Sequence, residues 1–182
     1  MRVSTTLAII FTTAVVTASS AQALQLSDGT IFFAVPPQLI TATTTFETVG
    51  ARDATYYFTL SIPENAGEPL QQVTIAQRGG TQEIKFALKD TTAFLGTRRH
   101  QRQGLSLAGV TKEKKAQLIS VTFNPPVSPG NTVTISLSPY QNPLFSGVYL
   151  FGVTAFPVGE KPHGQFLGFG RLQFYDRGGV FP

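Results

Sequence analysis

Apolar and polar residues alternate with a period of two along most of the chain after its first 23 residues, and this spacing predicts half-buried β-strands. The segment 55–62 shows the pattern most clearly, because Tyr56, Phe58, Leu60 and Ile62 would share one face of a strand. Further strands are expected at 31–35, 39–48, 73–75, 84–88, 119–123, 133–137, 147–156 and 165–176.

Glycine and proline mark the connections between these segments. The Gly79-Gly80 pair lies between 73–75 and 84–88 and indicates a hairpin, because two glycines tolerate the positive φ of a tight turn. The segment 124–131 holds three prolines, which lack the amide hydrogen that a sheet requires. We therefore expect that segment to be a connection and not a strand.

Helical periodicity is absent outside the first 23 residues. At most one short helix is expected, near 63–71, since Pro63 suits the first position of a helix. Roughly nine short strands at this spacing favour an all-β fold, a two-sheet antiparallel β-sandwich of the immunoglobulin-like type. Its core is predicted to contain Phe58, Leu60, Ile84, Phe86, Val121, Phe123, Val133 and Ile135.

The first 23 residues have the organisation of a signal peptide. Met1-Arg2 supplies a charged start, 7–16 is apolar, and Ala21-Gln22-Ala23 fits the cleavage signal. The apolar stretch is shorter than the roughly 20 residues that span a bilayer. We therefore expect cleavage after Ala23, no transmembrane anchor after processing, and one exported domain at 24–182 in the periplasm, the cell envelope or the medium.

The residue types that carry catalysis or hold metals are sparse. The chain has no cysteine, and its two histidines, His100 and His163, have no companion at metal-ligand spacing, so no cofactor or metal is expected. Nucleophile-elbow, phosphate-loop and zinc-protease motifs are all missing. The sequence favours a non-catalytic envelope protein. An enzyme that acts on envelope glycans through scattered carboxylates remains the alternative.

Positive charge is concentrated in one part of the least strand-like stretch, 89–116, which we expect to be a long loop. Between 98 and 115 there are six cations and a single acid, Glu113. Elsewhere after residue 23 acidic residues slightly outnumber basic ones. The candidate anion-binding residues are Arg98, Arg99, Arg102, Lys112, Lys114 and Lys115.

Two interpretations of these cations stay open: a solvated loop, and a patch for phosphate or carboxylate groups. Arginine can hold such groups with two parallel hydrogen bonds, while lysine supplies a point charge. Export would separate the protein from nucleic acid. The expected partners are therefore an anionic envelope polysaccharide, a lipopolysaccharide or an acidic protein.

A series of landmarks in a fixed order also resembles a known family. These landmarks are the segments 26–33, 36–37, 57–70, 126–130, 142–143, 147–151 and 168–171. Together they are similar to the domain-of-unknown-function family 2808, whose members are exported proteins found chiefly in cyanobacteria. The resemblance implies an envelope protein of a photosynthetic bacterium, and it brings no catalytic residues to carry over.

Overall fold

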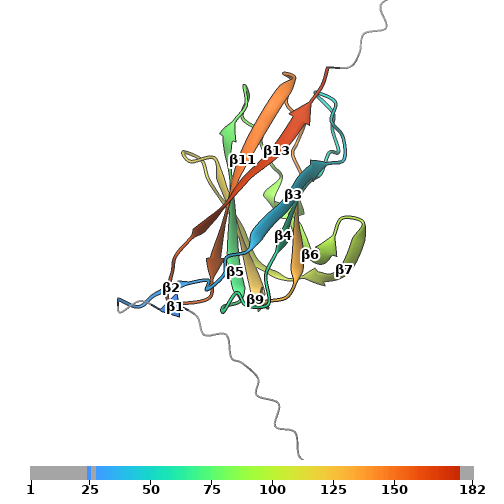
Figure 1. The fold of residues 1–182 in the computed structure, drawn as a ribbon. Coiled ribbons are helices and arrows are strands. Elements are labelled where there is room, and N and C mark those ends of the chain that lie inside the picture. Colours follow the sequence, from blue (N-terminus) through green and yellow to red (C-terminus); the bar gives the residue numbers. More distant parts are fainter. Residues whose placement is uncertain (1–23, 26–27, 177–182) are drawn as a thin grey trace, which may run out of the picture.

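The computed structural model describes residues 24–25 and 28–176 (Figure 1). The expected signal peptide at 1–23 lies outside the described residues. Two five-stranded antiparallel sheets pack face to face, which confirms the predicted β-sandwich. In spatial order the first sheet contains β3 (Gln38–Thr44), β4 (Tyr56–Ser61), β10 (Thr132–Leu137), β6 (Thr92–Thr97) and β7 (His100–Leu105). The second contains β13 (Gln165–Phe174), β11 (Gly147–Pro157), β5 (Leu70–Gly79), β9 (Leu118–Val127) and β8 (Leu107–Glu113).

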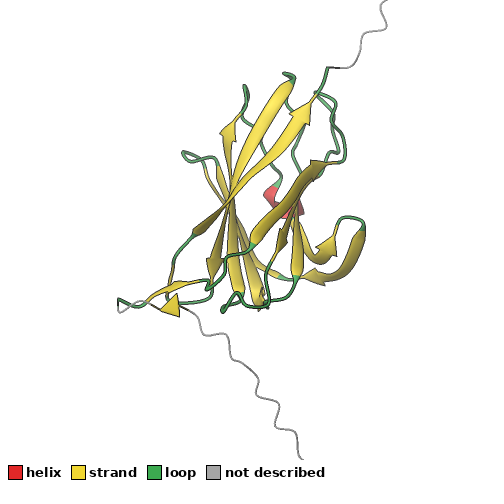
Figure 2. Ribbon diagram, viewed as in Figure 1, coloured by secondary structure: helices red, strands yellow, loops and turns green. Residues whose placement is uncertain are grey.

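Short elements complete the described part of the chain. Three of them form a small separate sheet: β1 (Leu24–Gln25), β2 (Thr30–Phe32) and β12 (Lys161–Pro162). Figure 2 shows a single short helical turn, the 3-10 helix η1 (Leu88–Asp90). No helix among the described residues is long and apolar enough to cross a membrane.

The core lies between the two sheets and is rich in aromatic rings. Phe151 of β11 packs edge-to-face against Phe58 of β4, with ring centroids 5.6 Å apart. Such pairs contribute roughly 0.5–1.5 kcal/mol beyond the burial of their surface. All eight residues predicted for the core are buried, with exposed fractions of 7% or less.

The predicted strand at 84–88 and the hairpin before it are wrong. Ile84 and Phe86 do point into the core, but the segment makes only one isolated bridge, between Phe86 and Pro139. Gly80 does not turn a hairpin. It has a φ of +122°, and a side chain there would collide with the ring of Tyr149.

Two other expectations at connections also need correction, while the third, at most one short helix near 63–71, agrees with the structure. The stretch 89–116 is not a long loop, because it forms β6, β7 and β8. The segment 124–127 continues β9, where a register shift opposite β5 tolerates the prolines. Near 63–71 there is a turn, closed by a 3.1 Å hydrogen bond from Ala66 N to Pro63 O, and not a helix.

Candidate binding surfaces

The six predicted anion-binding residues fall into two groups. Arg98, Arg99 and Arg102 lie on the hairpin formed by β6 and β7, which we call the arginine hairpin. Lys112 lies on β8, while Lys114 and Lys115 lie in the turn that leads into β9, the lysine turn. Figure 1 shows the hairpin at the right of the molecule and the turn at the left, so the six cations do not form one patch.

Local geometry folds the arginine hairpin over the outer face of the first sheet. Gly96 has a φ of +95°, and a Cβ atom there would collide with the carbonyl oxygen of His100, so only glycine fits. Thr134 Oγ1 donates to Gly96 O at 2.7 Å and lies 2.9 Å from Thr59 Oγ1. Both threonines face away from the core, yet they are almost fully buried. The hairpin is therefore anchored on the sheet by a buried hydroxyl pair.

The three arginines of the hairpin have different surroundings. The Arg98 guanidinium donates to Thr44 O at 3.3 Å and lies 5.0 Å from the centre of the Tyr57 ring. Arg99 and Arg102 are exposed. Arg102 also borders a hollow of about 310 Å³, lined by Gly96, Thr97, His100, Arg102, Gly130, Asn131 and Thr132. Arg98 is exposed as well, so all three arginines carry cations that face solvent, and Arg98 in addition helps to attach the hairpin.

The cations near the lysine turn are likewise unequal. Lys112 Nζ donates to Glu83 Oε1 at 2.8 Å. This hydrogen bond lowers the pKa of the Glu83 carboxyl below its ordinary value. Lys114 and Lys115 are exposed in the turn. Lys112 is thus paired with Glu83, and Lys114 and Lys115 are the two exposed cations of this group.

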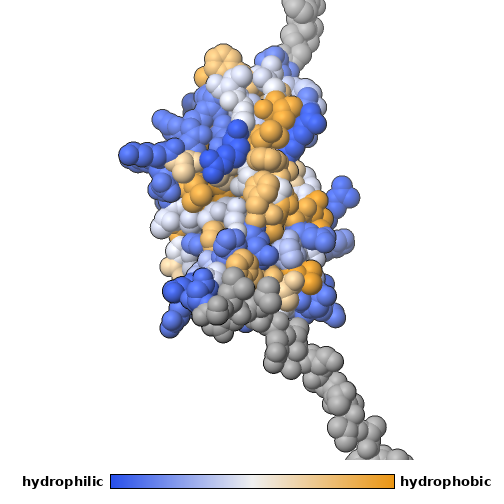
Figure 3. All heavy atoms as spheres, turned by 60° about the vertical axis from the view of Figure 1, so that its left-hand side comes forward, coloured by the Kyte–Doolittle hydropathy of each residue, from blue (hydrophilic) through white to orange (hydrophobic). Residues whose placement is uncertain are grey.

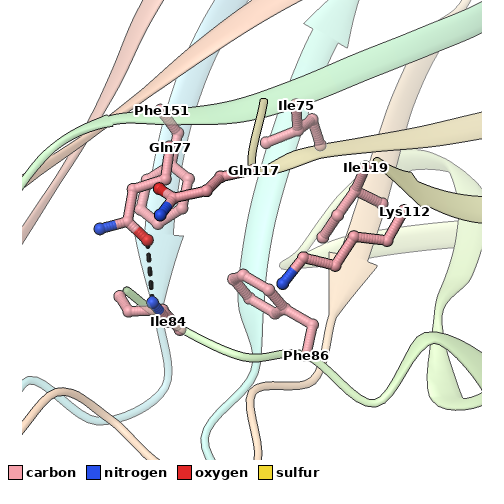
Figure 4. A pocket seen from close by; sticks show the side chains of 8 residues that line it. All are labelled: Ile75, Gln77, Ile84, Phe86, Lys112, Gln117, Ile119 and Phe151. Carbon is pink, nitrogen blue, oxygen red and sulfur yellow. Dashed lines mark hydrogen bonds between the residues drawn. The ribbon is translucent and has the colours of Figure 1, made fainter. Parts of the chain in front are cut away.

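Beneath Lys112 there is a gap between the second sheet and the segment 84–86 that Figure 4 shows in close-up. Its lining is mostly apolar, and Gln77 Oε1 accepts a 2.9 Å hydrogen bond from Ile84 N at its rim. The enclosed space is only about 10 Å³. That volume is about the minimum for one water molecule, so the gap is a packing feature and not a ligand site.

The two histidines have different surroundings. The centroids of the His163 and Phe32 rings lie 4.5 Å apart, so this contact joins the end of β2 to the residue that follows β12. His100 borders the hollow beside Arg102. Within the described residues no three acids or histidines come close enough to hold a metal ion. Two carboxylates, Asp53 and Asp90, do line the same surface hollow.

Large exposed hydrophobic side chains gather at one end of the sandwich, which the sequence did not single out. Figure 3 shows apolar surface in a band between polar regions. Five side chains that are at least 50% exposed lie at the end where β3, β10 and β13 finish: Phe46, Tyr140, Leu144, Phe145 and Tyr175. We call this region, formed by 45–55, 80–91, 138–146 and 175–176, the loop end. Exposed aromatic groups of this kind are typical of interaction surfaces.

One buried side chain, Asn142, joins the loops of this end. Its amide nitrogen donates to Phe46 O and Thr48 O, both at 2.9 Å, and its amide oxygen accepts from the Tyr56 hydroxyl at 2.8 Å. Burial raises the pKa of Tyr56, so this hydroxyl stays protonated and can donate. A further 2.8 Å bond runs from Asn142 N to Ala51 O. Asn142 is 1% exposed, and its hydrogen bonds hold these loops in a single arrangement.

Solved structures similar to the chain share little sequence with it. A collagen-binding domain of a Staphylococcus aureus adhesin is 10% identical, covers 75% of this chain and 97% of its own, and gives a TM-score of 0.38. The collagen-binding subdomain of the Enterococcus faecalis surface protein ACE is 10% identical, with coverages of 79% and 95% and a TM-score of 0.41. A cohesin module from Clostridium perfringens is 12% identical, with coverages of 75% and 97% and a TM-score of 0.40.

Sequence comparison gives a clearer result for the family than for any single protein. No curated protein sequence matches the chain significantly. The sequence profile described as "Protein of unknown function (DUF2808)" matches residues 30–174, which include nearly all the landmarks that suggested the resemblance. Since this match spans most of the chain, the protein belongs to the DUF2808 family.

Proposed function

We propose that the protein is a non-catalytic binding domain of the cell envelope that contacts an anionic partner through the arginine hairpin. The observation that carries the proposal is the exposure of Arg99 and Arg102 on a hairpin whose residues, 96–105, include no acid. Arg102 borders a hollow where a phosphate or carboxylate group could accept two parallel hydrogen bonds. The partner would be an anionic polysaccharide, a lipopolysaccharide or an acidic protein, as the sequence suggested.

The lysine turn supplies a matched control for this proposal. Changing Arg99 and Arg102 to glutamine removes two exposed charges, and so does changing Lys114 and Lys115. Retention on an immobilised anionic polysaccharide, polygalacturonate, is measured as salt is raised. We expect the arginine pair to account for most of the retention and the lysine pair for little. Equal losses would show that only net charge matters and would contradict the hairpin as the binding surface.

Export is part of this proposal and rests on the organisation of residues 1–23. Intact-mass measurement of the protein from its native envelope should show a chain that begins at Leu24. The alternative function, an enzyme for envelope glycans, has one supporting observation, the hollow that Asp53 and Asp90 share. Release of reducing sugar ends that disappears in an Asp53→Asn, Asp90→Asn variant would favour the enzyme.

A further inference from the structure

Three shallow hollows at the loop end adjoin one another through shared lining residues. Their volumes are about 560, 470 and 230 Å³. Asp53 lines both the first and the second, and Tyr140 lines both the second and the third. We call the three together the loop-end track. A run of linked hollows fits an extended chain of similar units better than one compact molecule.

The lining of the track combines exposed hydrophobic groups with hydrogen-bonding side chains. Phe46 lies in the first hollow, Tyr140 in the second and third, and Leu144 in the third. Their side chains are 50%, 67% and 57% exposed. Between them lie groups that donate or accept hydrogen bonds: Arg52, Asp53, Lys89, Asp90, Ser138, Gln82, Lys85 and Gln141.

Charge along the track is mixed and nearly balanced. Three basic residues, Arg52, Lys85 and Lys89, lie beside two acids, Asp53 and Asp90, and a third acid, Glu83, which is paired with Lys112. A surface of mixed charge gives little long-range attraction to a polymer of one sign. The track therefore differs from the arginine hairpin, where only cations are presented.

We propose that the loop-end track binds an uncharged polysaccharide chain. A sugar ring has a C–H face that packs on an aromatic ring, and hydroxyl groups at its edge that need both donors and acceptors. The track offers both kinds of contact. A protein partner fits less well, because the centres of protein interfaces are depleted in charged residues.

The hydrogen bonds of Asn142 make this surface suited to binding. Asn142 itself lines the third hollow, and it holds the backbone of Phe46 in the first. The backbone that carries Phe46 is thus positioned before a ligand arrives, which lowers the entropy that binding must offset. The proposal does not depend on the anionic partner, because the hairpin residues Arg99 and Arg102 are not part of the track.

The test is binding to a printed panel of neutral oligosaccharides built from glucose, galactose, mannose and N-acetylglucosamine, with uronate-containing chains for comparison. We expect at least one neutral chain to bind in a manner insensitive to salt. Tyr140→Ala and Phe46→Ala should each weaken that binding by about tenfold. Phe166→Ala is the matched control, because Phe166 is 58% exposed on β13 and lies outside the track.

The outcomes separate this proposal from the one for the hairpin. The Arg99→Gln, Arg102→Gln variant should bind the neutral chain as the unaltered protein does. Failure of every neutral chain to bind would overturn the proposal, and so would equal loss in the Phe166→Ala variant. Capture of protease-sensitive envelope material with no neutral chain bound would identify a protein partner instead and would also overturn it. Unchanged circular dichroism shows that the variants fold.

Discussion

The loop end lies beyond the regular strands of the sandwich and the arginine hairpin forms an edge of the first sheet, and the two are held in different ways. At the loop end, Asn142 is buried and joins three segments of the chain by four hydrogen bonds of 2.8–2.9 Å. The hairpin pairs with β10 only as far as Leu95, and beyond that residue it is attached through Thr134 and through the guanidinium of Arg98. Most of its other residues are exposed.

The difference matches the kind of contact that each region can make. Aromatic rings bind a flat ligand face best when the backbone that carries them is fixed, and at the loop end a buried polar group fixes the backbone around Phe46. Long cationic side chains on a projecting hairpin need less order, because charge acts over roughly 8–10 Å at physiological salt. The ordered backbone of the loop end and the exposed charge of the arginine hairpin therefore support two separate binding surfaces.

Removal of the Asn142 side chain should have the largest effect on stability. Asn142→Ala leaves the Tyr56 hydroxyl and two loop carbonyls without their partner, and it opens a small cavity. Orphaned buried polar groups cost about 1–3 kcal/mol each, so a loss of about 3 kcal/mol in the free energy of unfolding is expected. Urea denaturation measures it, with Gln101→Ala on the exposed hairpin as the control. A loss within about 0.5 kcal/mol would refute the role given to Asn142.

A smaller effect is expected where the hairpin meets the sheet. Thr134→Val keeps the shape of the side chain but removes the hydroxyl that donates to Gly96 O. We expect a loss of about 1 kcal/mol in the free energy of unfolding. Hydrogen exchange should accelerate at amides of 96–101 and stay unchanged at 45–55. Acceleration in both regions would mean that the two are not independent.

The smallest expected effect concerns the Glu83–Lys112 pair. The lowered pKa of Glu83 means that the pair stabilises the fold above the ordinary Glu pKa, and that this stabilisation is lost as pH falls through the lowered value. Because Glu83 is 38% exposed, the contribution should stay below about 1 kcal/mol. In Lys112→Gln, the Glu83 pKa measured by NMR should rise. An unchanged pKa would show that Lys112 is free to contact a partner.

The fold could be predicted from sequence wherever one face of a strand is buried. The alternation at Tyr56, Phe58 and Leu60 identified β4 because those side chains meet the opposite sheet. The same alternation at Ile84 and Phe86 was misleading. A period of two reports which side chains enter the core, and it does not show whether the backbone has a neighbour to pair with.

Strands at the edge of a sheet gave no such signal. Most residues of β7 are exposed, so polar residues occupy both of its faces and the stretch resembled a loop. The six cations were found in advance, but their division between two regions depends on which strands pair. Asn142 was visible only as a family landmark, because nothing local distinguishes a buried asparagine from an exposed one.

The most direct test of two separate surfaces is to occupy both at once. The neutral oligosaccharide that binds best is titrated calorimetrically into the protein, first alone and then saturated with polygalacturonate at low salt. Independent surfaces predict the same dissociation constant for the oligosaccharide in both titrations. Loss of oligosaccharide binding in the saturated protein would place both ligands on one surface and would contradict the account.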